Sequence, residues 1–522
     1  MSLTRPGLIA GLLVFLATPA QAAEPTMAPM PGMTAKPTIA PMPGMTATPT
    51  MTPMPGLTAK PTMAPMPGMT VTPTTTPMPG MSPSPHAGGM DMSSMRYNAN
   101  GVMSMYGMTT SGMHMDMSAL DPGTMSSTTD AGTPMTREGS GTSWMPDAGT
   151  VYGRMFGKGD DMEMTHGALF GEFVHTATAR GADALVAPGW LMYMRTHPTS
   201  PGAQLGFRAM ISPDPFSVGG QGYPMLFQSG EQWHDQPLHD YQHPHDLVSE
   251  LSVTYSGQLG NAHSAYLYAG YPGEPALGPP AFMHRPIAYD FAPAPIGHHW
   301  QDATHITFGV VTAGVASTKM KLEASAFTGR EPNEARYNID PAHLDSHSAR
   351  LSWNPNAYVA AQISYGFVKS PEAVAATVDV RRTTASVMYT RPLGFDSFWT
   401  HTAVWGQNNT TDGERSSSSL YETEYRRAGN GLFARFERVR KTGLDLVLPA
   451  PLSDETFPVS AYTVGLVHDL PHRAGRTVQA VGAAFTVNSK PAGLSPVYGA
   501  GTPLSFQVYY RLRPARRSVS RT

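Results

Sequence analysis

The sequence contains no cysteine, has few charged residues and lacks long hydrophobic runs. Without cysteine, disulfide frameworks, Cys-based zinc sites and thiol nucleophiles are excluded. The 35 Lys and Arg nearly balance the 38 Asp and Glu, giving a formal net charge of -3, so the chain lacks the basic excess with which nucleic-acid binders displace counterions. No stretch reaches the roughly 18 consecutive apolar residues that a membrane-spanning helix needs. If a membrane holds this protein, strands must cross it.

Residues 1–22 have the pattern of a signal peptide. Arg5 precedes an apolar run over residues 7–20, and Ala20-Gln21-Ala22 supplies the small residues that signal peptidase accepts. We therefore expect the chain to be exported.

Residues 23–85 form a twelve-residue repeat rich in proline and methionine. The copies share a core that reads Pro-Met-Pro-Gly-Met or nearly so, and they open at Pro25, Pro37, Pro49, Pro61 and Pro73. Proline at this density removes backbone donors and favours an extended, polyproline-like chain, so we expect disorder and no packed core. Polyproline II has three residues per turn, so Met27, Met30 and Met33 would lie along one face.

Residues 86–166 are interpreted as a linker rich in Met, His and Gly that is mostly disordered. Here thioethers stand beside an imidazole and a carboxylate, as in Met113-His114-Met115-Asp116-Met117. Residues 24–117, which we call the methionine-rich arm, contain 21 of the 35 methionines.

This concentration of thioethers predicts a binding site for soft metal ions. Thioether is an uncharged soft ligand that favours Cu(I) over Zn, Mg or Ca, and the same softness suits Ag(I). The ligands that we predict in the arm are Met27, Met30, Met33, Met42, Met45, Met63, Met66, Met69, Met78, Met81, Met90, Met92, Met113, His114, Met115 and Met117. An inert spacer, an oxidant sink and an adaptable contact surface are the alternatives. No organic cofactor is indicated.

Residues 167–513 alternate in polarity over segments of about ten residues. In the strand predicted over 348–354, Ala349, Leu351 and Trp353 point one way, while Ser348, Arg350 and Ser352 point the other. This period of two indicates strands with one apolar and one polar face. We count sixteen such strands, within a range of 12–16, and the sixth is predicted over 305–317. A tail follows over residues 514–522.

The lengths of the connections favour a transmembrane antiparallel β-barrel over a secreted two-sheet protein. Short connections such as 199–201 and 318–319 alternate with long ones such as 213–246 and 274–304, as the periplasmic turns and external loops of outer-membrane barrels do. The fold class is therefore all-β, in outer-membrane lipid, with both termini and the arm in the periplasm. A sixteen-strand barrel has an aqueous channel unless loops fill it.

Two long loops, 213–246 and 274–304, contain seven of the nineteen histidines. Loop 213–246 includes Gln-His-Pro-His-Asp, in which His243 and His245 are separated by one extended residue and could chelate Cu(II) or Zn(II) with a neighbouring carboxylate. Loop packing inside the lumen and substrate recognition are the alternatives. Catalytic motifs do not stand out, and Ser249 and His401 are candidates only by default, so we expect no enzyme activity.

The methionine-rich arm followed by a barrel resembles the copper resistance B proteins of Gram-negative outer membranes. The resemblance rests on Met90-Asp91-Met92, on residues 113–117 and on the Met-Pro-Gly-Met repeats. The barrel itself differs, since residues 271–284 look like those of a separate outer-membrane family. The resemblance implies sequestration or passage of copper, with periplasmic copper carriers as partners. The alternatives are a general diffusion porin with an inert tether and a structural or adhesion protein of the envelope.

Overall fold

The computed structural model describes residues 98–103, 115–117, 121–471 and 477–516. The predicted signal peptide, the repeats over 23–85 and the arm ligands from Met27 to His114 lie outside the described residues. Among those described, no helix is long and apolar enough to cross a membrane.

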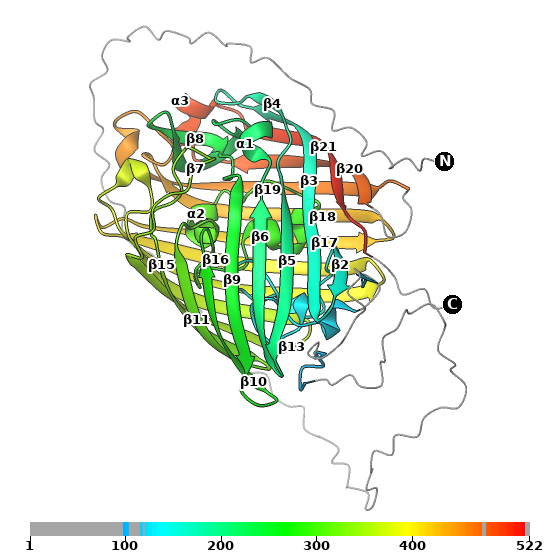
Figure 1. The fold of residues 1–522 in the computed structure, drawn as a ribbon. Helices are drawn as coiled ribbons and strands as arrows, with labels where there is room; N and C mark the ends of the chain where they lie inside the picture. Colours follow the sequence, from blue (N-terminus) through cyan, green and yellow to red (C-terminus); the bar gives the residue numbers. More distant parts are fainter. Residues whose placement is uncertain (1–97, 104–114, 118–120, 472–476, 517–522) are drawn as a thin grey trace, which may run out of the picture. The chain divides into compact units, whose positions relative to one another are not determined.

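Within the described residues, sixteen antiparallel strands close into a barrel (Figure 1). Each strand pairs with the next one along the barrel, and β21 pairs with β3 to complete the ring. The barrel strands are β3 (Asp161–Ala177), β5 (Gly189–Ser200), β6 (Ala203–Ile211), β9 (Val248–Gln258), β10 (His263–Gly270), β11 (Val310–Ser317), β12 (Met320–Phe327), β13 (Ser346–Asn356), β14 (Val359–Val368), β15 (Val380–Gly394), β16 (Ser397–Thr410), β17 (Arg415–Arg427), β18 (Asn430–Thr442), β19 (Thr456–Asp469), β20 (Thr477–Ser489) and β21 (Leu504–Pro514). The predicted sixteen-strand barrel is confirmed.

Short elements decorate this barrel. At the seam, β2 (Gly153–Lys158) pairs with residues 161–166 of β3, where β21 no longer reaches, and β1 (Met115–Asp116) pairs with β2. The remaining elements are β4 (Asp183–Val186), β7 (Tyr223–Trp233), β8 (Gln236–Gln242), α1 (Asp214–Ser217), α2 (His298–Gln301), α3 (Ser495–Tyr498), and the 3-10 turns η2 (Pro122–Thr124), η3 (Met135–Arg137), η4 (Phe282–His284), η5 (Pro286–Tyr289), η6 (Ala303–His305), η7 (Ala373–Ala375), η8 (Leu452–Asp454) and η9 (Ala492–Leu494).

The two faces of the strands differ as the alternation predicts. On β13, Leu351 and Trp353 are 39% and 50% exposed, whereas Arg350 and Ser352, which alternate with them, are each 1% exposed and lie inside. A closed sheet leaves no unpaired edge, and its apolar outer face suits lipid, so the secreted two-sheet alternative is wrong.

The connections alternate in length around the barrel. One end has the turns 201–202, 318–319 and 357–358, and the other has the long loops 212–247 and 271–309. The first end is therefore the periplasmic one and the second is external.

Residues 271–309, which we call the inner loop, fold into the lumen instead of covering its mouth. Almost every residue of this segment is buried. Asp290 forms ion pairs with Arg426 and Arg511, which project inward from β17 and β21. Because residues 305–309 belong to this inner loop, β11 begins at Val310 and not at the predicted residue 305.

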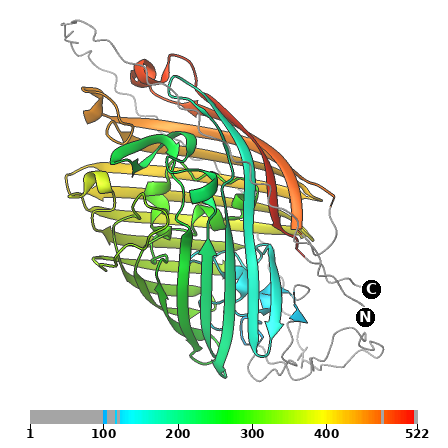
Figure 2. The ribbon, with the colours of Figure 1, turned by 45° about the horizontal axis from the view of Figure 1, so that its top comes forward.

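Residues 121–150, which we call the plug segment, also lie inside the barrel. Arg350 donates to the Thr142 hydroxyl over 2.9 Å, and Asn354 donates to the Met145 carbonyl over 2.9 Å. The plug segment also meets the inner loop, since the Ala281 amide donates to the Ser140 hydroxyl over 2.7 Å. Figures 1 and 2 show the cyan plug segment and the green helices of the inner loop enclosed between the front and back strands.

This arrangement corrects three predicted boundaries. Within the predicted linker 86–166, residues 121–166 are folded and contribute to the plug segment, β2 and β3. The barrel therefore starts at Asp161, not at residue 167, and β21 extends to Pro514, one residue into the predicted tail. The plug segment is poor in apolar residues, but polar groups of the inner wall satisfy its backbone, so it needs no core of its own.

Candidate functional site

The described end of the methionine-rich arm enters the barrel interior. Met115 pairs through its backbone with Gly157 of β2, and the Met117 amide donates to the Met155 carbonyl over 2.9 Å. The Met117 side chain is 3% exposed, and Gly157 leaves room for its sulfur, because a Cβ at that glycine would collide with it. Met103, also from the arm, is buried as well.

Thioethers continue from this point across the inner wall in rows set by strand register. Met155 on β2 is opposite Met164 on β3, and Met164 is opposite Met194 on β5. In the next row, His166 on β3 is opposite Met192, which in turn is opposite Met210 on β6. Directly opposed residues have Cβ atoms about 4.5–5.5 Å apart, so these side chains are neighbours.

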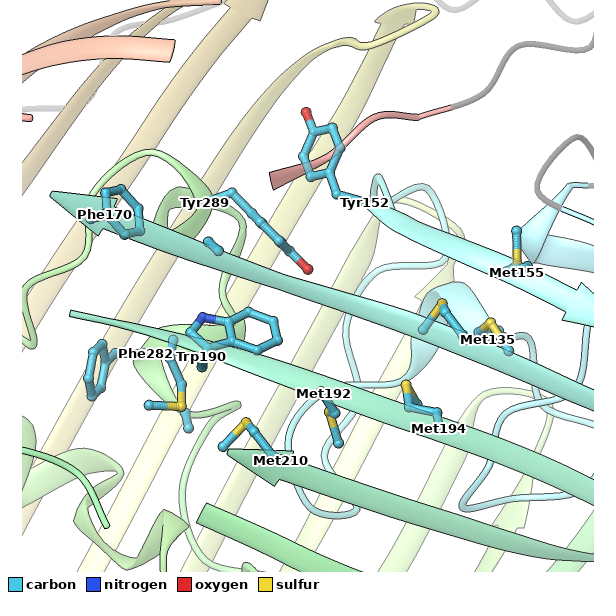
Figure 3. Close-up of a cluster of buried hydrophobic side chains, with 14 of the residues drawn as sticks. Met135, Tyr152, Met155, Phe170, Trp190, Met192, Met194, Met210, Phe282 and Tyr289 are labelled. Carbon is cyan, nitrogen blue, oxygen red and sulfur yellow. The ribbon is translucent and has the colours of Figure 1, made fainter. Parts of the chain in front are cut away.

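These rows form one buried cluster with residues from the arm, the plug segment and the inner loop. Figure 3 shows Met192, Met194 and Met210 on the neighbouring strands, together with Trp190 and Met135. The methionines of this methionine cluster are Met103, Met117, Met125, Met135, Met155, Met162, Met164, Met192, Met194, Met210 and Met283. A porin lumen is ordinarily polar, so this part of the wall is unusual in its chemistry.

A cavity of about 50 Å³ lies beside the methionine cluster. Two histidines line it, His166 from β3 and His284 from the inner loop, and their ring centroids are 6.1 Å apart. Both are more than nine-tenths buried, and the Nε2 atom of each lacks a hydrogen-bond partner among the described residues. Its sulfur-bearing lining residues are Met135, Met145, Met164, Met192 and Met194.

The electrostatics of this cavity permit a monovalent cation. Arg208 also lines the cavity, but its guanidinium is 2.5 Å from Glu250 and 3.1 Å from Glu138, so its charge is compensated. Burial lowers the pKa of His284 well below its usual range, with smaller contributions from His166 and Arg208. His284 is therefore neutral at physiological pH and keeps a lone pair available for a ligand.

A second group of histidines forms where the external loop 212–247 meets the inner loop. The ring centroid of His243 is 6.3 Å from that of His245 and 6.1 Å from that of His299. His298 and His305 complete the group, with ring centroids 5.0 Å apart. Sequence alone placed these histidines on two separate loops, and the inward fold of residues 271–309 brings them together.

His243 and His245 have different carboxylate partners in this group. The His243 Nε2 atom lies 3.3 Å from Glu231, whereas the His245 Nδ1 atom lies 2.8 Å from Asp214. Burial lowers the pKa of His243 well below its usual range. No set of three or more His, Asp and Glu in the described ranges is arranged to hold a metal ion. Each of the two imidazoles has a carboxylate partner of its own, and the chelation by His243 and His245 stays a prediction.

The two default catalytic candidates, Ser249 and His401, lie in different environments and have different hydrogen-bond partners. Ser249 is buried and its hydroxyl donates to the Asp246 carbonyl over 3.0 Å. His401 lies on the outer face of β16, where its Nδ1 is 2.7 Å from the Tyr421 hydroxyl. The structure does not bring Ser249 and His401 together.

Sequence reasoning missed the methionine cluster, although a signal was present. Met162, Met164 and His166 are spaced by two, as are Met192 and Met194. In a strand this spacing places them on one face. This spacing of two in the barrel strands was therefore the sequence signal for the methionine cluster.

No protein-family model matches the sequence, and no curated protein is significantly similar to it. Solved structures similar to this chain include the anion-selective porin from Comamonas acidovorans, with 14% identity over 67% of this chain and 99% of the porin and a TM-score of 0.39. OmpF of Salmonella typhi in complex with daunomycin has 11% identity over 68% of this chain and 98% of its own, with a TM-score of 0.40. The outer membrane channel DcaP of Acinetobacter baumannii has 9% identity over 68% and 97%, and a TM-score of 0.40.

These likenesses are distant, and the fold is established by the strand pairing of the chain itself. A closed sixteen-strand barrel with an apolar outer face and one end of long loops belongs in the Gram-negative outer membrane. The chain is thus a porin-like outer-membrane barrel.

Proposed function

We propose that this outer-membrane barrel binds soft metal ions, Cu(I) and Ag(I), through its methionine-rich arm and contributes to copper handling or tolerance. One observation supports the proposal most. Met103 and Met117, from the described end of the arm, lie in the same buried cluster as the inner-wall methionines Met155 and Met164. An ion held by thioethers of the arm would find ligands of the same kind at the barrel entrance.

The competing explanation of these methionines is simple packing. Methionine fills irregular gaps, and a plug inside a barrel needs such filling. Leucine, valine or alanine would serve that purpose in a folded interior, however, and none of them binds metal. The juxtaposition of Met164 and Met192 with His166 and His284, whose Nε2 atoms lack a hydrogen-bond partner among the described residues, supports metal binding over packing alone.

The segments that fill the lumen argue against the diffusion-porin alternative. The inner loop and the plug segment both contact the inner wall, through Arg426 and Arg350 among others. A general diffusion porin keeps an aqueous channel, which these segments would obstruct.

The test is a titration of the full-length protein in detergent with Cu(I), in competition with a chromogenic Cu(I) chelator. We expect binding of several equivalents, tighter than micromolar, because the arm contains many thioethers. A matched variant with the arm methionines changed to glutamine should lose most of these equivalents, since glutamine is similar in length but offers hard donors. Binding that is weak and unchanged in the variant would contradict the proposal.

A conductance measurement on the same protein in a planar bilayer separates the remaining alternatives. A steady ohmic current would support the diffusion porin. A structural or adhesion protein predicts neither metal binding nor current.

A further inference from the structure

Two buried imidazoles face one cavity from different parts of the chain. His166 is fixed on β3, while His284 lies in the inner loop, and the Trp190 ring contacts both, at centroid distances of 5.0 and 4.8 Å. The His166 Nδ1 atom is 3.3 Å from the Tyr289 hydroxyl, which orients the ring. The Nε2 atoms of both histidines remain without a hydrogen-bond partner among the described residues.

The separation of these two rings suits a shared ion. A metal–nitrogen bond is about 2 Å long, so two imidazoles bound on opposite sides of one ion have ring centroids roughly 6 Å apart. The observed centroid distance between His166 and His284 is 6.1 Å. Leaving two buried ring nitrogens unpaired is unfavourable, and a bound ion would remove that cost.

Thioethers complete the surroundings of this position. Met192 lies directly opposite His166 across the β3–β5 pair, and Met164 and Met194 occupy the adjoining row on the same inner face. All three line the same cavity as the two histidines. Imidazole together with thioether is a ligand set that prefers Cu(I) to the harder Zn, Mg or Ca.

We propose that the barrel interior holds one discrete site for Cu(I) or Ag(I), formed by His166 and His284 with thioethers from Met164, Met192 and Met194. This site is separate from the arm, and it rests on the proposed function only for the class of ion. Because His284 belongs to the inner loop, an ion at this site ties the inner loop to the wall at β3 and β5.

The site is tested with Ag(I), a diamagnetic probe, on full-length protein whose methionine methyl groups carry ¹³C. The solution contains detergent and no halide, and the spectra are assigned by single Met→Leu variants. We expect the methyl resonances of Met164, Met192 and Met194 to shift as Ag(I) is added. The matched control is Met210, which belongs to the methionine cluster but does not line the cavity. Met210→Leu should leave the three shifts unchanged.

His284→Phe should abolish the shifts of Met164, Met192 and Met194 while the arm resonances still respond. Should this variant fail to fold as a heat-modifiable barrel, the double variant Met192→Leu and Met194→Leu replaces it, because such volume-conserving changes are usually well tolerated. The double variant should weaken Ag(I) binding at this site by more than ~10-fold, since even groups that only orient a ligand contribute about 10–100-fold.

The outcomes separate this site from the proposed function. If the three methyl groups stay unshifted at saturating Ag(I) while the arm responds, the interior site is wrong and the arm stands. If the three shift and the arm does not, the interior site stands and the arm is inert. Shifts that persist in His284→Phe would overturn the ligand assignment.

Discussion

Met192 lies directly opposite His166 on the neighbouring strand, and both side chains point into the lumen. This pairing places a thioether beside an imidazole on a rigid wall, where the strands fix their separation. Sites built on loops depend on how the loop is held, so the contribution of His284 depends on the contacts that anchor the inner loop.

Asp290 is a charged anchor of the inner loop, and we predict that Asp290→Asn loosens it. The carboxylate pairs with Arg426 and, over 2.7 Å, with Arg511, all buried. Removing one partner of a buried pair typically costs about 3–5 kcal/mol. Asp469 also pairs with both arginines and compensates part of their charge, so we expect a loss near the lower end of this range. The variant should unfold at a lower temperature and conduct more current in a planar bilayer.

A surface pair provides the control for this change. Asp183 pairs with His175 on the outer part of β3, where the two side chains are 58% and 36% exposed. Asp183→Asn should change stability by no more than ~1 kcal/mol and leave the current unchanged. Equal behaviour of the two variants would mean that Asp290 does not anchor the inner loop.

The plug segment should likewise limit conductance. We predict that replacing residues 121–150 with a Gly/Ser linker of equal length increases the single-channel current, because a sixteen-strand barrel without filling has an aqueous lumen. Deleting residues 24–85 instead should leave the current at the wild-type level. A plug replacement that conducts no better than wild type would show that the inner loop alone closes the barrel.

Much of the barrel could be predicted from sequence because the physics of a strand in lipid is local. Alternation such as that of residues 350–353 predicts which side chains face the lipid and which face the lumen. The lengths of the loops predict which end of the barrel is periplasmic and which is external. The predicted strand at 348–354 corresponds to β13 over Ser346–Asn356, with similar agreement around the ring.

The contents of the lumen could not be predicted in this way. Residues 121–150 owe their order to partners far along the chain, such as Arg350 for Thr142, and no local pattern encodes such contacts. The same holds for His284, which approaches His166 only because the inner loop folds inward. The composition of the sequence indicates the arm as a metal-binding segment, whereas the candidate site that the structure describes lies on the inner wall of the barrel.

His305 should make the packing of the inner loop sensitive to acid. It lies in η6, and burial lowers its pKa well below the usual range; His298 and His245 lower it further, while Asp302 acts in the opposite direction. Because the folded pKa is below the unfolded value of about 6.5, the unfolded chain binds more protons as the pH falls. The contribution of His305 to the free energy of unfolding is therefore fully present above about pH 6.5 and is lost progressively as the pH falls below that value.

The measurement is the unfolding temperature of wild type and His305→Asn at pH 7 and pH 5. At pH 5 a histidine that is buried in its neutral form contributes up to about 2 kcal/mol less to the free energy of unfolding than at pH 7. Wild type should therefore lose more stability than the variant between these two pH values. Comparing the two proteins removes the effect of Glu274, whose pKa burial raises to about 8 and which opposes this trend. Parallel losses in the two proteins would exclude His305 as the sensor.

Copper tolerance of the native host should depend on the sulfur of the arm and not on its length. We predict that changing the methionines of residues 24–97 to glutamine lowers the copper concentration that permits growth, because the chain then lacks the soft ligands that would hold Cu(I) in the periplasm. Full-length protein must still reach the outer membrane, which heat-modifiable migration of the barrel reports. The control changes the threonines of the same residues to serine, which keeps every thioether and should leave tolerance unaltered. Unaltered tolerance in the glutamine variant as well, with the interior site still responding to Ag(I), would confine metal binding to His166, His284 and their thioether neighbours.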